Sequence, residues 1–226
     1  MYTKLVILLF AMSTHMLYAQ SHETRFKVSD NPSLIIHASN GRIEVKGTEG
    51  LDEIVVRCIK KRFWNAKYVA LDEIDKITAE ATDEGVKITE NTSGRLFYQL
   101  SYEVEVPINT SLELRTSAKD IVINDISGEV NAETNGGDIV IDLEKVQHGT
   151  VAKTSGGKIE AKVPLTGLDL QLEANDIEAD LHEFKGDVHE SKLTGRTYLV
   201  SGKMNGGGPK IDFHTAGGEI ILLFNN

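Results

Sequence analysis

The feature that most constrains the fold is a six-residue pattern that recurs in the second half of the chain. Its clearest copy is Thr134-Asn-Gly-Gly-Asp-Ile139, and five copies each end on an isoleucine, at Ile121, Ile139, Ile159, Ile177 and Ile220. Successive isoleucines are 18, 20, 18 and 43 residues apart. Mostly apolar residues stand nine and seven positions before each isoleucine and two positions after it. Each unit therefore predicts a strand, a glycine corner, a second strand and a longer return, which is typical of stacked repeat proteins.

The repeated apolar positions predict a shared interior. Positions two apart along a strand point to the same face, and strands stacked about 4.8 Å apart bring equivalent positions into columns. This favours a coiled, solenoid-like all-β stack with an apolar interior. An antiparallel meander is the alternative, because Asn135-Gly136 is also a strong hairpin signal. The paired glycines suit a corner with positive φ or close backbone approach, so we expect Gly136→Val and Gly157→Val to disrupt folding.

The glycine distribution divides the chain into two parts. Of the 20 glycines, 15 follow Ser111, whereas the earlier part is β-rich and varied. Within it, Asn65 could cap a short helix over residues 66–77, where Val69, Ile74 and Ile77 form a modest apolar stripe. We predict a β-rich N-terminal cap with one short helix over residues 20–110 and a repeat domain over residues 111–226. The pattern does not fix the number of units between Phe184 and Ile211.

The first 19 residues have the order of a secretory leader. Lys4 precedes an apolar run over residues 5–12, and a polar patch then leads to Leu17-Tyr18-Ala19. This order predicts cleavage after Ala19. The run is shorter than the roughly 20 apolar residues that span a membrane, and the rest of the sequence has no second one. We therefore expect an exported protein of the periplasm, cell surface or extracellular space that is not an integral membrane protein.

Composition and charge exclude several classes of function. Lys and Arg number 24 against 34 Asp and Glu, which gives a net charge of −10. Nucleic-acid binding is not expected, because it needs a concentrated basic surface. The single cysteine, Cys58, excludes an internal disulfide framework and a multi-thiolate metal site, and we expect it to be buried and inert. The sequence has no phosphate-binding loop, nucleophile elbow or zinc-binding helix motif, so we predict no catalytic, cofactor-binding or metal-binding residues.

An acidic column is expected beside the corners. Its members share one position of the repeat: Asp120, Asp138, Lys158, Asp176 and Glu219. A divalent cation could bind such oxygen ligands. The alternative, which the low number of carboxylates per unit favours, is a solvated face on which Lys158 relieves part of the repulsion.

Aromatic and basic residues of the first part form the best candidate for a partner surface. The candidate residues are Arg62, Phe63, Trp64, Tyr68, Phe97 and Tyr98. Rings with nearby cations are suited to binding a glycan or an envelope protein. The alternative is that these rings cover the open end of the stack, because a solenoid needs its ends capped.

The C-terminal strand poses a related problem. Residues 219–224 form an apolar strand two residues from the end of the sequence, with nothing after it to cover it. An open apolar edge is a template for another chain. We therefore predict either a homo-oligomer formed through this strand or a fold-back of the early part of the chain.

The stretch from Tyr102-Glu-Val-Glu-Val-Pro107 through the repeats resembles an exported bacterial family labelled putative adhesins, β-strand-repeat domains of unknown function. The resemblance implies a right-handed β-solenoid-like fold in or outside the cell envelope, without catalytic residues. It favours a non-enzymatic surface or envelope protein that binds glycan or protein. Two alternatives stay open: a polysaccharide-processing enzyme on a coiled β fold, and a sensor or partner subunit of an envelope signalling system.

Overall fold

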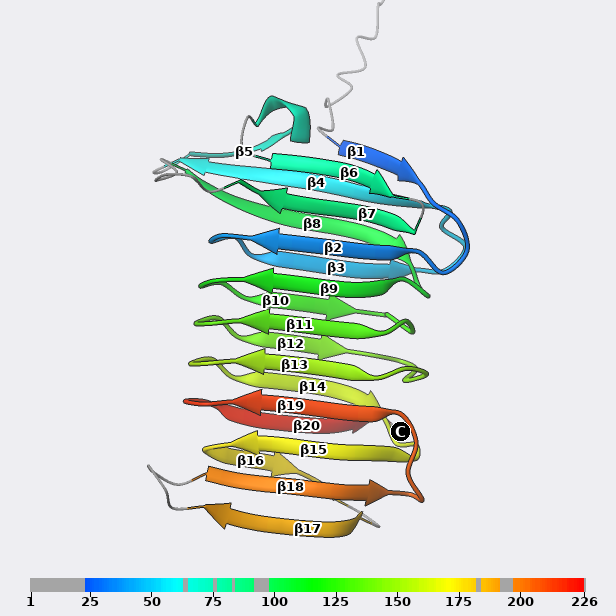
Figure 1. Cartoon of the computed structure of the whole chain (residues 1–226), viewed down its shortest axis with the longest axis vertical. Helices are drawn as coiled ribbons and strands as arrows, with labels where there is room; N and C mark the ends of the chain where they lie inside the picture. Colours follow the sequence, from blue (N-terminus) through cyan, green and yellow to red (C-terminus); the bar gives the residue numbers. More distant parts are fainter. Residues whose placement is uncertain are drawn as a thin grey trace, which may run out of the picture.

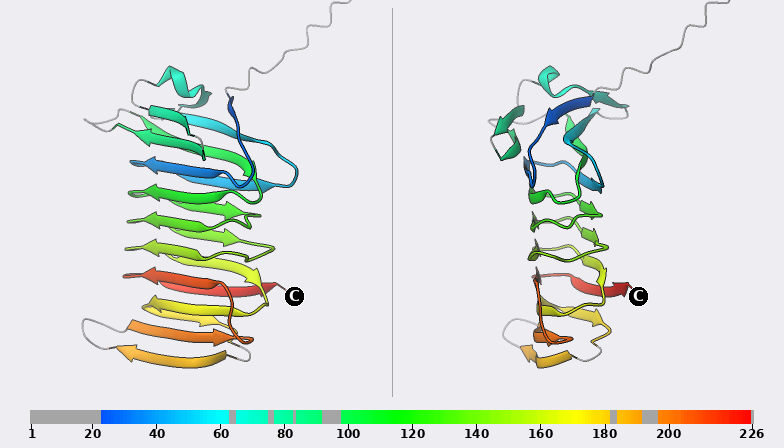
Figure 2. Two further views of the ribbon diagram at one scale, coloured as in Figure 1. Left: turned by 45° about the vertical axis from the view of Figure 1, so that its right-hand side comes forward. Right: turned by 90° about the vertical axis from the view of Figure 1, so that its right-hand side faces the viewer.

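The protein consists of two ten-stranded β-sheets that face each other along the long axis of the molecule (Figure 1). A computed structural model describes residues 23–225, apart from 63–64, 75–76, 83, 92–97, 182–183 and 192–196. The expected leader therefore lies outside the described residues. Figure 2 shows the two sheets side-on as two layers, with the apolar interior between them.

Each sheet is defined by its strand order. Sheet A contains, in spatial order, β1 (Glu23–Lys27), β4 (Glu53–Arg62), β8 (Gln99–Pro107), β3 (Ile43–Thr48), β10 (Ile121–Asn124), β12 (Ile139–Asp142), β14 (Ile159–Pro164), β20 (Glu219–Asn225) and β16 (Asp176–Ala179), while β5 (Asn65–Val69) pairs with β4. Sheet B contains, from the other end, β17 (Phe184–Ser191), β18 (Thr197–Met204), β15 (Leu168–Ala174), β19 (Lys210–Thr215), β13 (Thr150–Thr154), β11 (Val130–Thr134), β9 (Ser111–Thr116), β2 (Ser33–Ala38), β7 (Gly85–Glu90) and β6 (Ile77–Thr82). We call the end with β1 and β6 the head and the end with β16 and β17 the tail.

The repeats stack in parallel, which confirms the solenoid-like prediction and excludes the meander. A rung is one strand of sheet B followed, across a corner, by one strand of sheet A. The isoleucine column is continuous from rung to rung, in the order Ile43, Ile121, Ile139, Ile159, Ile220 and Ile177. Ile177 is partly buried and the other five have no exposed surface. Burial of each such side chain contributes roughly 1.5–3 kcal/mol. The handedness of the coil stays a prediction.

The spatial order of the rungs differs from their order in the chain. From head to tail they are β7/β8, β2/β3, β9/β10, β11/β12, β13/β14, β19/β20 and β15/β16. The first rung of the chain, β2/β3, lies between β7/β8 and β9/β10, and the last, β19/β20, lies between β13/β14 and β15/β16. The stack thus includes strands from the segment that was expected to form the cap.

The position of β20 corrects one expectation. This strand pairs with β14 on one side. On the other side, its residues Glu219–Leu222 pair with β16. It is therefore not the uncovered end of the stack, and the expectation of an open apolar edge is wrong for these four residues. The tail is instead formed by β16 and by the antiparallel hairpin of β17 and β18.

The corners join the rungs through a buried threonine. Thr154 Oγ1 donates a hydrogen bond to the carbonyl oxygen of Gly137 in the neighbouring rung, at 3.0 Å, and accepts one from the amide of Gly157, at 3.1 Å. The same pair of bonds occurs at Thr134 and Thr215. Each hydroxyl therefore closes its own corner and attaches it to the next one, so the threonine of the repeat pattern has a structural role.

In the β11/β12 and β13/β14 corners, packing requires only the second glycine of the pair. A Cβ atom at Gly157 would overlap the carbonyl oxygen of Gly137, whereas a Cβ at Gly136 would have only Ala118 Cα near it, at 3.8 Å. In these two corners the rungs approach each other closely at the second position and not at the first. The steric reason expected for Gly157→Val is present, but Gly136 has room for a side-chain carbon.

The unit ending at Ile177 departs from the expected alignment. Leu170 pairs with Ile211, and Leu172 pairs with Phe213. The pattern had instead placed Leu168 and Leu170 at these positions. Ala174 occupies the place of the corner threonine, and only two residues separate it from Ile177. The corner is shorter because it has neither the threonine nor the glycine pair.

The expected helix over residues 66–77 is also corrected. Asn65–Val69 is strand β5, followed by one 3₁₀ turn, η1 (Leu71–Glu73). β5 pairs antiparallel with β4, from Cys58 with Val69 to Arg62 with Asn65. The strand is favoured because it pairs with the edge of β4 and buries Val69 and Leu71, which are each at most 4% exposed. These contacts outweigh the weak helical preference of the apolar stripe.

Candidate functional site

The structure describes three of the six residues of the expected partner surface. Phe63, Trp64 and Phe97 lie outside the described residues. Arg62 is exposed at the end of β4, and Tyr68 on β5 is 46% exposed. Tyr98 precedes β8 and packs partly against the core.

Tyr68 and Tyr98 lie on opposite faces of sheet A. Tyr68 pairs across the strands with Ile59, on the outer face, and its hydroxyl donates a hydrogen bond to Glu103 Oε2 at 3.2 Å. The negative charge of Glu103 raises the pKa of the Tyr68 hydroxyl. Tyr98 lies on the inner face, where Lys60 Nζ is 4.3 Å from its ring centroid in a cation–π contact. The two tyrosines therefore do not belong to one surface.

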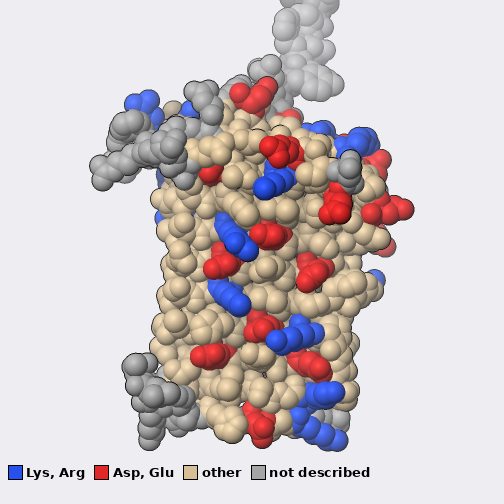
Figure 3. All heavy atoms as spheres, viewed as in Figure 1, with Lys and Arg blue, Asp and Glu red and all other residues tan. Residues whose placement is uncertain are grey.

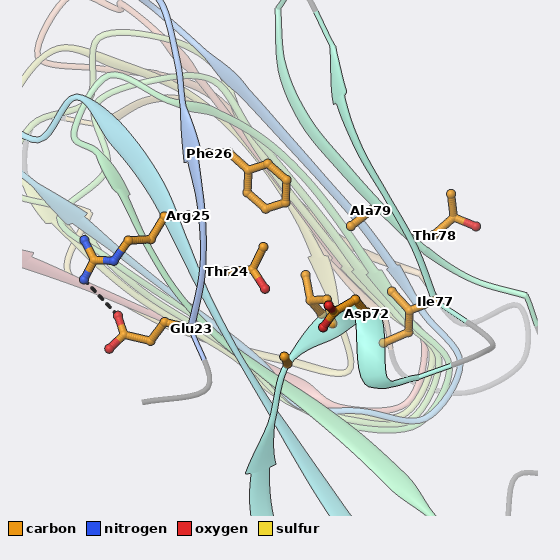
Figure 4. A pocket seen from close by; sticks show the side chains of 10 residues that line it. Glu23, Thr24, Arg25, Phe26, Asp72, Ile77, Thr78 and Ala79 are labelled. Carbon is orange, nitrogen blue, oxygen red and sulfur yellow. Dashed lines mark hydrogen bonds and ion pairs between the residues drawn. The ribbon is translucent and has the colours of Figure 1, made fainter. Parts of the chain in front are cut away.

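A cleft of about 650 Å³ opens between the two sheets at the head. It is lined by residues 23–26 of β1, residues 70–72 at η1 and residues 77–79 of β6. Figure 4 shows Thr24 and Phe26 pointing from β1 toward β6, while Glu23 and Arg25 point away. The register agrees, because Thr24 and Phe26 pair with Val56 and Ile54, which are inner-face residues of β4.

The cleft exists because the interior continues beyond the last complete rung. Ala79 faces inward beside the buried Ile88 of β7, and Ala70 and Thr24 are also small, so the space between the sheets is not filled. No sequence signal marks this cleft, since its apolar residues form no motif. Its volume lies within the range of small-molecule clefts, about 300–1,000 Å³.

Charge at the cleft is balanced locally. Glu23 on its rim accepts hydrogen bonds from Arg25, at 3.0 Å, and from Arg57, at 3.3 Å. Arg25 also pairs with Glu53. These ion pairs hold β1 on β4 and leave the inner walls without a strong field of one sign, so the cleft suits a neutral or weakly charged ligand.

The outer face of sheet B is polar and of mixed sign. Figure 3 shows Lys and Arg interspersed with Asp and Glu along it. Arg115 lies 3.3 Å from Glu113, and His214 Nδ1 lies 3.3 Å from Glu173 Oε2. A shallow hollow of about 310 Å³ beside His214 is lined mostly by such paired groups. Exposed pairs of this kind contribute little to stability, and alternating signs keep the face solvated.

Comparison with protein families identifies the fold. The family model described as Toastrack DUF4097 matches residues 31–222. The chain belongs to this family. The resemblance to a β-strand-repeat family of unknown function is thereby confirmed, and the Toastrack match covers both the head and the repeats.

Two solved structures are similar to the Toastrack chain. One is a crystal structure of a putative cell adhesion protein from Clostridium sporogenes, with 12% sequence identity and a TM-score of 0.57, covering 90% of this chain and 99% of that one. The other is a putative adhesin from Bacteroides fragilis, with 8% identity and a TM-score of 0.25, covering 89% and 96%. The first likeness supports the fold. None of the curated proteins compared with the chain matches it.

The acidic column of the Toastrack repeats binds backbone amides. Asp120 Oδ1 accepts a hydrogen bond from the amide of Asp138, at 3.1 Å, and Asp138 Oδ1 accepts one from the amide of Lys158, at 2.8 Å. In the described part of the chain, no group of three or more His, Cys, Asp or Glu side chains could hold a metal ion. No helix among the described residues is long and apolar enough to cross a membrane.

Cys58 is fully buried on β4, and we predict that its alkylation by iodoacetamide is slow in the native Toastrack chain. Burial raises the pKa of the Cys58 thiol to about 12. Because the thiolate is the reactive form and the native thiol has no exposed surface, native alkylation at pH 8 should be at least about a hundredfold slower than in urea-unfolded protein, where the thiol has its ordinary pKa of about 8.5. Mass spectrometry of timed samples measures both rates, and comparable rates at pH 8 would contradict the prediction.

Proposed function

We propose that this chain is a non-enzymatic, exported protein of the cell surface or envelope, which binds a glycan or another envelope protein at the head. The observation that carries the proposal is the cleft of about 650 Å³ at the end of the stack. Tyr68 precedes Ala70, the first cleft residue after β5, by two positions in the chain and lies on the outer face of sheet A.

The stack is suited to presenting such a site. Seven rungs share one apolar column system and hydrogen-bonded corners, so the head is held on a rigid support. Binding to a preformed cleft on a rigid support loses little conformational entropy. The expected leader over residues 1–19 supports export, and the description of the Clostridium sporogenes protein as a putative cell adhesion protein accords with a surface role.

The cleft offers contacts for both kinds of partner. Phe26 and Ile77 provide apolar surface, while Thr24 and Asp72 provide hydrogen-bonding groups. The exposed Tyr68 ring adds an aromatic platform outside the cleft. Sugars and protein side chains both combine apolar faces with hydrogen-bonding groups, so the partner must be identified by binding.

The test measures binding of residues 20–226 to a glycan array and to separated envelope proteins of the producing organism. We expect Ala79→Phe, which fills the cleft, to weaken binding at least about tenfold, equivalent to about 1.4 kcal/mol. Thr82→Phe on the same strand is the control, since Thr82 is exposed and does not line the cleft. Equal binding by both variants would contradict the head site, and shortened glycan products would contradict the non-enzymatic assignment. Thermal unfolding verifies that both variants are folded.

A further inference from the structure

Part of one edge of β20 has no neighbouring strand. On the β14 side, pairing extends from Ile220 to Asn225, and the amide of Leu165 then donates to the carbonyl oxygen of Asn225 at 3.2 Å. On the other side, β16 ends at Ala179, opposite Leu222. Within the described residues, no strand pairs with this edge at residues 223–225. Figure 1 shows β16 ending before β20 does, and Figure 2 shows the end of β20 leading away from the stack.

The unpaired edge adjoins an exposed apolar hollow. Leu223 and Leu165 are each 44% exposed, and among the described residues only Tyr68 is another large hydrophobic residue with comparable exposure. A hollow of about 320 Å³ lies beside them, with walls formed by Ala179, Leu222 and Phe224 as well. The hollow occupies the place into which a continued β16 would extend. Unpaired backbone and exposed apolar surface therefore meet at one place.

The charge around the hollow indicates what can fill it. Glu178 and Asp180 are exposed on its rim. Lys162 on β14 pairs with Leu223 on the side of β20 opposite to the hollow, and its Nζ lies 3.7 Å from Asp142 Oδ2. A second copy of the chain would bring the same two carboxylates together, and each copy has a net charge of −10. Like charges disfavour that pairing, whereas a basic segment is attracted.

We propose that an extended segment of a partner protein, with alternating apolar and basic residues, adds as a strand to β20 at residues 223–225. Its backbone pairs with the edge that β16 leaves uncovered. Its apolar side chains lie on the inner face with Phe224, while its basic side chains lie on the outer face, where their aliphatic stems contact Leu223 and their charged ends approach Glu178 and Asp180. Main-chain hydrogen bonds give such strand addition its affinity, and the alternate side chains give specificity.

The test uses three labelled, end-blocked heptapeptides and fluorescence anisotropy with residues 20–226. The first alternates Lys and Val, the second alternates Glu and Val, and the third is the Lys/Val peptide with Pro at the central Val. We expect the Lys/Val peptide to bind at least about tenfold more tightly than either of the others, a difference of about 1.4 kcal/mol. Equal binding of the Lys and Glu peptides would overturn the charge argument. Unchanged binding of the proline peptide would overturn strand pairing, because proline removes a backbone donor.

Variants of the protein locate the site. Leu223→Ser and Glu178→Gln should each weaken binding of the Lys/Val peptide at least about fivefold, about 1 kcal/mol. Val122→Ser is the control, because Val122 faces outward on β10, which has strands on both sides. Equal binding by Leu223→Ser and Val122→Ser would overturn the site. A dimer in sedimentation that Leu223→Ser abolishes would show that a second copy occupies the edge instead. The site does not depend on the head cleft, so Ala79→Phe should leave peptide binding unchanged.

Discussion

Deletion of residues 210–226 is expected to abolish cooperative folding, although these are the last 17 residues of the sequence. The deletion removes β19 and β20, which form an internal rung between β13/β14 and β15/β16. The lost core side chains are Ile211, Phe213, Ile220 and Leu222, each at most 1% exposed. At roughly 1.5–3 kcal/mol each, their burial contributes roughly 6–12 kcal/mol. That is comparable with the whole stability of about 5–15 kcal/mol for a typical domain.

Circular dichroism during heating measures this effect. In a repeat stack whose last rung is terminal, the same deletion would leave a shorter but folded protein. The matched control is deletion of residues 224–226, which leaves Ile220 and Leu222 in place along with the pairing of β20 and β16. We expect the control to unfold cooperatively, with a midpoint lowered by only a few degrees. If the protein lacking residues 210–226 unfolded cooperatively at a temperature close to that of the full chain, β15/β16 would be able to dock directly on β13/β14. That result would contradict the prediction.

The internal position of both terminal rungs follows from how the chain returns. After β3 the chain passes through β4, β5 and β6 at the head before it forms β7/β8 and then β9/β10. After β16 it passes through β17 and β18 at the tail before it forms β19/β20. The excursions cap the two ends, and strands from near both ends of the described chain have neighbours on both sides. Fraying from a chain end, the usual weakness of a stack, is thereby opposed at both ends.

The stacking was predictable from sequence, but the order of the rungs was not. The isoleucines define the register, because a shared interior forces like positions into one column. Ile159, however, pairs with Ile220 and not with Ile177, the next in the chain. The interior faces of the rungs are chemically alike. The repeat pattern therefore predicts that the rungs stack, but it does not predict which rungs are neighbours. That choice depends on the β17–β18 excursion, whose sequence lies outside the pattern.

The candidate site was less predictable for a related reason. The helix expected over residues 66–77 is in fact strand β5 over Asn65–Val69. Without that strand, the register that places Tyr68 on the outer face could not be predicted. Alternation along β4 and β8 then puts Tyr98 on the inner face, although the two rings are close to the same strands. The head cleft depends on the absence of bulk at Thr24 and Ala79. Small residues on a strand carry no sequence signal for a cavity, so only the packing reveals it.

Gly157→Ala is expected to lower the free energy of unfolding by about 3 kcal/mol or more. Its Cβ would overlap the carbonyl oxygen of Gly137, which already accepts the hydrogen bond from Thr154 Oγ1. The new Cβ is fixed to the Gly157 backbone and the carbonyl belongs to the neighbouring corner, and paired strands flank both corners, so no flexible side chain can move to relieve the contact. Separation of the two rungs would weaken the Thr154 bond and open the isoleucine column between Ile139 and Ile159. Overpacking of rigid sites costs about 1–3 kcal/mol, and a lost buried hydrogen bond adds about 1 kcal/mol.

Gly156→Ala, one residue earlier in the same corner, is the matched control for urea unfolding. A Cβ at Gly156 would be 3.7 Å from the carbonyl oxygen of Asn135, which is an ordinary contact. Both variants make the same reduction in the entropy of the unfolded chain, so that contribution cancels in their comparison. We expect Gly156→Ala to remain within about 1 kcal/mol of the unaltered protein. Equal losses at both positions would mean that the corner needs glycine for its backbone conformation, and the close approach of neighbouring rungs would then not be the reason for the repeated glycine.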